Sequence, residues 1–189
     1  MKFFVFLWFA VSAGFAVGPQ PAGQPAAQST LQPADALARL AFMQGDWAGK
    51  QNFNTNGGPA MVGDARDSVA MGIAGKYLCE TLSTTLPGRK PTDTRHFLSF
   101  DKQSGKYTAW WFNDTSYHPT LLTGDLTGNL TGNKLVLMSD PSGSGPVLRA
   151  TYESPIPDKL TFQLEMKNGD GWTSLFVTTY LKSAGVAKQ

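Results

Sequence analysis

The stretch LAFMQGDWAGK, residues 40–50, joins a helical pattern to a β pattern. Apolar side chains around its start recur at the spacing of one helix face, namely at Leu37, Leu40, Ala41 and Met43. Pro33 precedes this pattern and Gly45 follows it, and these residue types are expected at the start and the end of a helix. The stretch therefore predicts a short helix that ends at Gly45, with Trp47 at the head of the first strand.

Beyond this junction the sequence shows short β patterns separated by turn residues such as NTNGG, PGRKP, DKQSG and DPSGSGP. The alternation of apolar and polar residues predicts strands at residues 46–54, 61–71, 76–86, 94–101, 106–113, 118–126, 134–139, 147–153, 159–166 and 171–182. Several connections are short enough for hairpins, which pair sequential strands antiparallel. We therefore predict an all-β fold, an antiparallel up-and-down β-barrel of about ten strands with a short N-terminal helix.

The segments outside the barrel differ in composition. Residues 1–16 start with a charged Lys2 and continue as an apolar run that ends in small residues, as is typical of a secretory signal peptide cut near Ala16. The run is short for a membrane span, so we expect no stable membrane anchor. Residues 17–33 are rich in Pro, Ala and Gln and predict a flexible linker, residues 34–182 predict the barrel domain, and residues 183–189 a disordered tail.

Charge and cysteine content exclude several classes of protein. The chain has 16 Lys and Arg against 14 Asp and Glu, so it lacks the basic patch of a nucleic-acid-binding protein. Its single cysteine, Cys79, excludes an internal disulfide, and we expect the core alone to stabilise the fold. Cys79 lies in an alternating strand pattern, which favours a small buried residue over a nucleophile.

The junction itself resembles a known pattern. A short helix followed by Gly45-Asp46-Trp47 at the head of a β-barrel is similar to the lipocalins and the wider calycin group. The chain resembles more closely a bacterial family known as domain of unknown function 1579. The matching pieces are LAFMQGDWAG (40–49), SFD (99–101), KYTAWWFND (106–114) and TYLK (179–182). This resemblance implies a calycin-like barrel and, with the signal peptide, export to a bacterial periplasm or secretion.

In such a barrel Trp47 is expected to close one end beneath the helix. A buried tryptophan ring removes about 200 Å² from water and adds several kcal/mol of stability. In lipocalins an arginine of the last strand stacks over this ring, and the equivalent residue here is Lys182, a weaker cation–π partner. We therefore expect Gly45, Trp47 and Lys182 to form a structural motif and not a ligand site.

The sequence assigns no catalytic residue and no metal site. The G-x-S-x-G motif of serine hydrolases is absent, as are the closely spaced His and Cys ligands of zinc sites. We expect no cofactor, with haem as the alternative. The nitrobindins, calycin-like barrels that this architecture resembles, bind haem through one histidine, and the candidates here are His96 and His118.

The strand patterns predict which residues line the barrel interior. His96 shares a strand face with Leu98, and Glu80 lies in an apolar–hydroxyl strand. In the aromatic cluster Trp110 and Phe112 face one way, Tyr107 and Trp111 the other; one pair packs the core, and the other lines a pocket mouth or packs outside. The candidates for ligand contact are therefore His96, Leu98, Trp110, Phe112, Glu80 and Tyr180.

These observations favour a non-enzymatic barrel that holds a small apolar or lipid-like molecule in its interior. The first alternative is a barrel that binds haem or nitric oxide through a histidine. The second is an enzyme of unrecognised type with a polar interior around Glu80.

Overall fold

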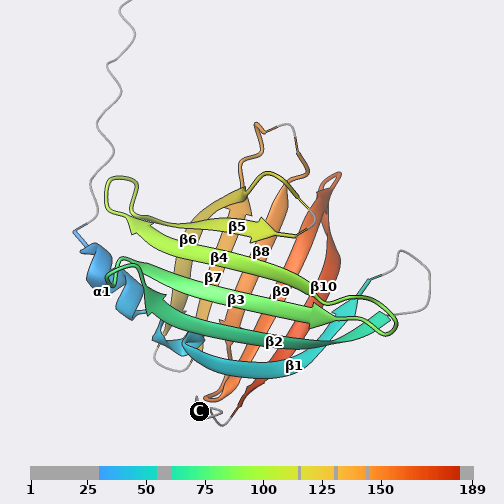
Figure 1. The fold of residues 1–189 in the computed structure, drawn as a ribbon. Coiled ribbons are helices and arrows are strands. Elements are labelled where there is room, and N and C mark those ends of the chain that lie inside the picture. The colour runs from blue at the N-terminus through green and yellow to red at the C-terminus, as the bar shows by residue number, and fades with distance from the viewer. Residues whose placement is uncertain (1–29, 55–60, 115, 130–131, 144, 184–189) are drawn as a thin grey trace, which may run out of the picture.

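The fold is a closed β-barrel with a helical segment at one end (Figure 1). A computed structural model of the chain describes residues 30–54, 61–114, 116–129, 132–143 and 145–183. The helical segment consists of α1 (Pro33–Ala38) and the 3₁₀ turn η1 (Ala41–Met43). The strands are β1 (Gly45–Phe53), β2 (Met61–Gly72), β3 (Tyr77–Thr85), β4 (Thr92–Asp101), β5 (Lys106–Asn113), β6 (Thr120–Asn129), β7 (Gly132–Ser139), β8 (Leu148–Ser154), β9 (Lys159–Asn168) and β10 (Gly171–Lys182).

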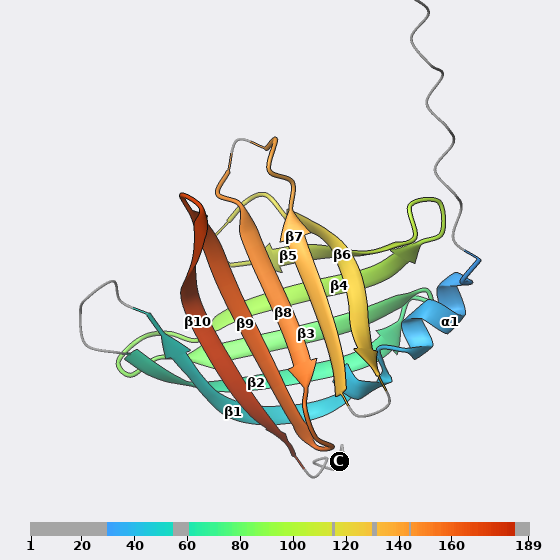
Figure 2. The ribbon, with the colours of Figure 1, turned by 180° about the vertical axis from the view of Figure 1, so that it is seen from behind.

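Every strand pairs antiparallel with its neighbour in sequence, and β10 closes the ring against β1, as Figure 2 shows from behind. The predicted all-β, up-and-down barrel is therefore confirmed. Closure leaves no unpaired sheet edge, which explains how so many short strands form one stable sheet. Within the described residues, no helix is both long and apolar enough to span a membrane. The predicted signal peptide and most of the predicted linker and tail lie outside the described residues.

The helical segment differs from the single helix that the sequence predicted. It breaks after Ala38, and Ala41 is exposed although the pattern placed it on the buried face. The buried side chains are Ala36 and Leu37 in α1 and then Leu40 and Met43, so that from Leu37 onward they are three residues apart. The backbone bonds follow the same period, because Leu40 N–H donates to Leu37 C=O at 3.0 Å and Met43 N–H to Leu40 C=O at 2.9 Å. Three residues per turn is the 3₁₀ period, so packing on the barrel end overrides the α-helical pattern.

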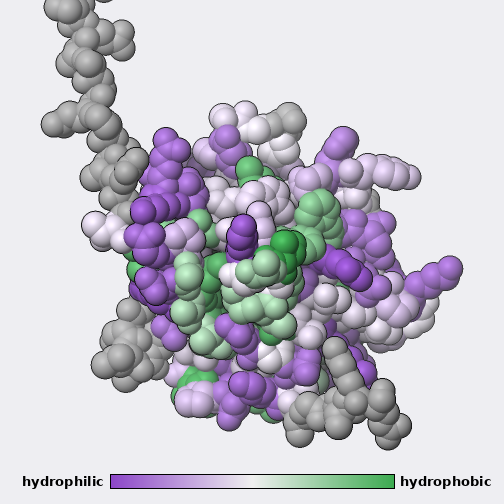
Figure 3. Space-filling view, turned by 60° about the vertical axis from the view of Figure 1, so that its left-hand side comes forward, coloured by the Kyte–Doolittle hydropathy of each residue, from purple (hydrophilic) through white to green (hydrophobic). Residues whose placement is uncertain are grey.

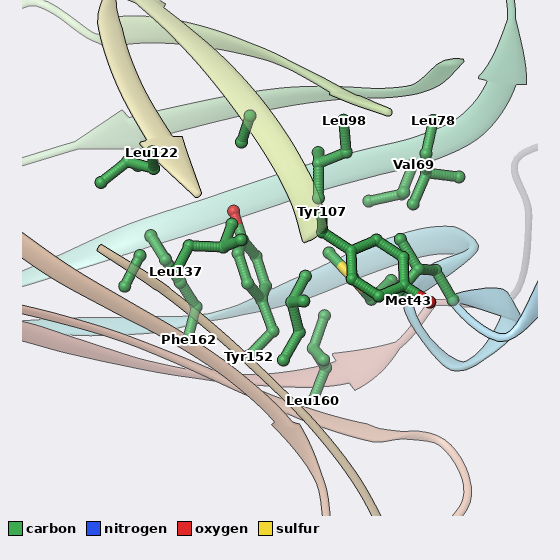
Figure 4. Packing of buried hydrophobic residues seen from close by; sticks show 14 of the residues in the cluster. Met43, Val69, Leu78, Leu98, Tyr107, Leu122, Leu137, Tyr152, Leu160 and Phe162 are labelled. Atoms are coloured by element: carbon green, nitrogen blue, oxygen red, sulfur yellow. The ribbon is translucent and has the colours of Figure 1, made fainter. Parts of the chain in front are cut away.

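The core fills the barrel at this helical end (Figure 4). Residues that alternate along each strand point inward, and the largest of them with under 2% exposure include Leu78, Leu98, Leu122, Leu135, Leu137 and Leu160. Tyr107 links this core to the helix, because its O–H donates to Ala36 C=O at 2.8 Å. Cys79, which we expected to be buried, lies on the outward face of β3 and is half-buried, since its neighbours Leu78 and Glu80 take the inward positions.

The junction at residues 45–47 seals the end of the barrel below the helical segment. Trp47 is 3% exposed, and its indole Nε1–H donates to Met43 C=O at 2.7 Å. Lys182 is the register partner of Trp47 on β10, and its Nζ lies 5.5 Å from the centre of the indole ring. The lysine thus takes the place of the arginine that stacks in lipocalins.

We predict that Gly45→Ala destabilises the barrel by about 1 kcal/mol or more. Gly45 has a φ of 131°, and a Cβ there would lie 2.9 Å from Cε of Lys182. Gly75→Ala is the matched control, because Gly75 also has a positive φ but its Cβ would meet nothing within 4 Å. Urea unfolding should show a larger loss for Gly45→Ala than for Gly75→Ala. Wild-type stability in Gly45→Ala would contradict the assigned strain.

Candidate functional site

Polar side chains gather inside the barrel, next to the apolar core. They come from both sides of the ring, with Tyr152 on β8 and Thr178 and Tyr180 on β10 facing the strands β2 to β5. We call the set the interior polar cluster: Asp67, Glu80, His96, Trp111, Tyr152, Thr178 and Tyr180. Each of these residues is at most 6% exposed. A charged residue is almost never buried in this way without a specific reason, so the cluster is the leading candidate site.

Three members of the cluster form a hydrogen-bonded centre. Glu80 and His96 are register partners on β3 and β4, and His96 Nδ1 lies 2.7 Å from Glu80 Oε2. Tyr152 reaches across the barrel from β8, and its O–H donates to the same Oε2 at 2.8 Å. The Tyr152 hydroxyl oxygen is also 3.0 Å from His96 Nδ1. Glu80 Oε2 thus contacts both His96 Nδ1 and the Tyr152 hydroxyl, and these contacts orient the imidazole.

Aromatic rings hold this centre in place. The ring of Trp111, the register partner of His96 on β5, stacks on the imidazole at 4.3 Å with an angle of 17° between the planes. Phe162 of β9 stacks on Tyr152 at 4.5 Å and meets Trp111 edge-on at 5.7 Å. Figure 4 shows Tyr152 and Phe162 among the core side chains. Packing on both sides of the polar centre restricts its rotamers and so preorganises the site.

Several polar atoms of the cluster have no hydrogen-bond partner among the described residues. They are both carboxyl oxygens of Asp67, Glu80 Oε1, His96 Nε2, Trp111 Nε1, Thr178 Oγ1 and Tyr180 Oη. Asp67 and Glu80 lie close enough to hydrogen-bond through a shared proton, and the hydroxyls of Tyr180 and Thr178 lie close enough to pair with each other. Among the described residues, His96 Nε2 and Trp111 Nε1 have no such neighbour. Native proteins pair nearly all buried polar atoms, because leaving one unpaired costs about 1–3 kcal/mol. A concentration of unpaired atoms on one set of inward positions therefore indicates a site that a polar ligand group or water completes.

Burial sets the protonation of the cluster. It raises the pKa of Glu80 to about 7, and the hydrogen bond from Tyr152 offsets part of that rise. Burial and the nearby Glu80 charge together raise the pKa of Asp67 well above its ordinary value. Burial also lowers the pKa of His96 to about 3, so the imidazole is neutral at physiological pH. With Nδ1–H donating to Glu80, the His96 Nε2 atom is then an acceptor with a free lone pair.

The residues predicted to contact a ligand fall into two groups. Glu80, His96 and Tyr180 belong to the interior polar cluster, and Leu98 lies in the apolar core. Trp110 and Phe112 instead face outward, with Phe112 46% exposed. The alternation within β5 allowed either face to point inward, and the barrel places the smaller Ala109 with Tyr107 and Trp111 inside. His118, the other haem candidate, is exposed in the turn before β6.

Sequence reasoning did not single out Asp67, Tyr152 or Thr178. A signal existed for Asp67, because Ala65 and Val69 flank it on the apolar face of β2. An acid in the apolar register of an alternating strand is unusual, and it indicates a buried carboxyl. Tyr152 carries no comparable signal, since an inward tyrosine is an ordinary core residue.

Two grooves on the outer surface are weaker candidates. One, of about 500 Å³, runs over β1 to β3 and is lined by the outward side chains of Asp46, Arg66, Ser68, Thr81 and Ser83. The other, of about 250 Å³, is apolar and is lined by Ile73, Tyr77, Phe97, Trp110 and Phe112. Figure 3 shows apolar side chains grouped near the middle of one face of the molecule, with polar side chains around them. The lining of the larger groove also includes the buried residues Trp47 and Asp67, whereas the described lining of the apolar groove contains no buried polar residue.

A metal ion or a haem group requires particular donor atoms from the protein. In the part of the chain that the structure describes, no three His, Cys, Asp or Glu residues come together as metal ligands. Haem iron needs one axial nitrogen, and His96 Nε2 is an unpartnered one. The surroundings fit haem poorly, however, because Trp111 lies flat on the imidazole and two carboxyls stand beside it.

The closed ten-strand antiparallel barrel with a short helical segment at one end is consistent with a calycin-like fold. The chain matches the family described as "Protein of unknown function (DUF1579)" over residues 32–182, and it belongs to that family. The search of curated proteins gave no match. Among solved structures, the crystal structure of Rv2717c from M. tuberculosis is similar, with a TM-score of 0.64 and 17% identity over 81% of this chain and 99% of that chain. At this identity the likeness shows the fold alone.

Proposed function

We propose that this protein binds a small amphipathic molecule inside the barrel, with the polar end of the ligand at the interior polar cluster. The observation that carries the proposal is the pair of buried, unpartnered atoms His96 Nε2 and Trp111 Nε1 in the same interior cluster as the two carboxyls of Asp67 and Glu80, which have no cationic partner among the described residues. Polar groups that converge within an apolar interior are how ligand sites fix orientation and specificity. The sequence suggested an apolar ligand, and the polar groups of the interior indicate that the ligand also carries a polar group at one end.

The apolar part of the ligand has a suitable surface on the side of the cluster away from the helix. Phe176 of β10 contacts Phe162 at 5.6 Å and Phe53 of β1 at 5.5 Å. Phe53 and Phe176 are only half-buried register partners; Phe53 ends β1 at the end away from Trp47, and Phe176 lies in the middle of β10. Burying them against an apolar chain contributes binding energy at about 25 cal/mol per Å².

We expect hexan-1-ol, as a probe, to shift the Trp111 indole N–H resonance in a saturable way. The Trp111 Nε1–H is a buried donor without a partner, so an alcohol oxygen at the cluster changes its environment. Trp110 is the matched control, because it is the next residue on β5 and faces the outer apolar groove. Its indole resonance should stay unchanged in ¹⁵N-edited spectra, with Trp111→Phe used for the assignment. A shift of Trp110 alone, or no saturable shift, would overturn the proposal.

Haem is a second candidate because of the free Nε2 of His96. Purified protein with a Soret band that vanishes in His96→Ala but persists in His118→Ala would favour haem over the amphipathic molecule. The enzyme alternative rests on the buried carboxyls of Asp67 and Glu80, since acid–base catalysts have raised pKa values of this kind. It stays a prediction.

A further inference from the structure

The barrel interior holds two carboxyls and no cation. Asp67 is 3% exposed and Glu80 is 2% exposed, while no lysine or arginine is among the buried residues that the structure describes. His96, the nearest basic group, is neutral because burial lowers its pKa to about 3. Glu165 on the outer face differs from these two carboxyls. It is also nearly buried, but it forms an ion pair with Arg149 Nε at 2.7 Å. Buried carboxyls ordinarily have such a cationic partner, whereas Asp67 and Glu80 hydrogen-bond to each other, which requires that they share a proton.

The acceptors that remain free match one chemical group. Glu80 Oε2 is used by Tyr152 and His96, which leaves Oε1 without a partner. Asp67 offers two further carboxyl oxygens, and it lies within hydrogen-bonding reach of Glu80. These acceptors come from two adjacent strands, β2 and β3. A primary ammonium group has three N–H donors and no acceptor, so it can replace the proton that the two carboxyls share and donate to both of them.

We propose that the interior site binds an organic primary amine in its ammonium form, held by Asp67 and Glu80. The inference rests on the proposed function and names its ligand class. An apolar chain on the amine extends over Phe53 and Phe176.

Binding of the ammonium group is linked to protons. The titratable groups that face the site are Asp67 on β2, Glu80 on β3, His96 on β4, Tyr152 on β8 and Tyr180 on β10. Burial keeps both tyrosines and the histidine neutral at physiological pH, because it raises the pKa of each hydroxyl and lowers that of the imidazole. The carboxyls are the groups that change. A bound ammonium favours their ionised forms, so binding releases protons and tightens as the pH rises.

The experiment compares hexylamine with hexan-1-ol, two probes of equal chain length. NMR titration of the Trp111 indole N–H should give at least tenfold tighter binding of hexylamine at about pH 8, the scale of one charge-assisted hydrogen bond. The preference should shrink at about pH 6, where Glu80 holds its proton. Calorimetry in two buffers with different ionisation enthalpies should detect proton release on hexylamine binding and none on hexan-1-ol binding.

Variants assign the effect to the two carboxyls. Glu80→Gln and Asp67→Asn should each lower the ratio of hexylamine affinity to hexan-1-ol affinity, with both affinities measured in the same variant. Asp125→Asn is the matched control, because Asp125 pairs with Lys106 on the exterior and should leave both affinities unchanged. Equal affinity for the two probes in wild type, at either pH, would overturn the amine proposal and leave the proposed function standing. Failure of both probes to shift Trp111 would overturn the proposed function as well. If a variant does not fold, the change in the wild-type preference for hexylamine between about pH 6 and about pH 8 tests the amine proposal.

Discussion

Trp47→Ala is expected to lower the free energy of unfolding by about 3–5 kcal/mol, the range for large aromatic side chains removed from a core. The indole is 3% exposed and lies where the helical segment, β1 and the end of β10 meet. Its removal leaves a cavity, and it leaves the Met43 carbonyl without the donor that now lies at 2.7 Å. The Lys182 side chain also loses the ring that it covers. Urea unfolding followed by far-UV circular dichroism measures the loss.

Two further variants separate the contributions to this loss. Trp47→Phe keeps most of the apolar ring but lacks the N–H, so we expect a smaller cost of about 1–3 kcal/mol for the unpaired carbonyl. Trp110→Ala removes the same side chain from the outer face and should cost about 1 kcal/mol. Ligand affinity should be unchanged in Trp47→Phe, because Trp47 is outside the interior polar cluster. A Trp47→Ala variant that melts like wild type but loses ligand would contradict the structural role.

The fold was predictable because its signals are local. Gly45 and Trp47 mark where a helix ends and a strand begins, and the alternation of each later strand shows its length and its turns. Antiparallel hairpins then connect neighbours in sequence, so the order of the strands follows without long-range information. The break between α1 and η1 was not predictable in this way. It depends on how Leu37, Leu40 and Met43 fit the barrel end, which is a tertiary effect.

The site was only partly predictable because its contacts are long-range. Glu80 was noticed as an acid in an apolar strand, but its partner Tyr152 lies 72 residues further along the chain. No local pattern brings those two residues together; closure of the ring does. In β5 the sequence KYTAWWFN has aromatic residues on both faces, so alternation alone allowed two equivalent solutions. The inward face proved to be that of Tyr107 and Trp111, and Trp110 and Phe112 face outward.

Replacing Glu80 by a residue that cannot ionise should change how the free energy of unfolding depends on pH. In the fold Glu80 has a pKa of about 7, raised by burial from the ordinary value of 4.5. The folded barrel therefore holds a proton that the unfolded chain releases. Its contribution to stability is fully present below about pH 4.5 and is lost as the pH rises through about 7. The difference between the two pKa values corresponds to about 3 kcal/mol.

His96 contributes with the opposite sign. Burial lowers its pKa from 6.5 to about 3, so the unfolded chain takes up a proton that the folded barrel does not. Stability from this residue is therefore lost as the pH falls from 6.5 towards 3. Asp67, whose pKa burial raises, acts in the same direction as Glu80. A single pH curve of the wild type mixes these contributions, and a comparison of variants is needed to separate them.

Glu80→Gln isolates the glutamate. The amide oxygen of the glutamine can still accept from Tyr152 and His96, so the orientation of the imidazole is kept while the charge is removed. We expect wild type to lose about 3 kcal/mol relative to this variant between about pH 4.5 and about pH 8, measured by urea unfolding at each pH. The stability of Asp125→Asn, a substitution on the exterior, should depend on pH as that of wild type does. If the stability of Glu80→Gln depended on pH as that of wild type does, the pKa of Glu80 would be the same in the fold as in the unfolded chain, and Glu80 would be ionised in the fold at neutral pH. The barrel would then have to hold a buried carboxylate without a cation, which is the condition that the structure gives the strongest reason to exclude.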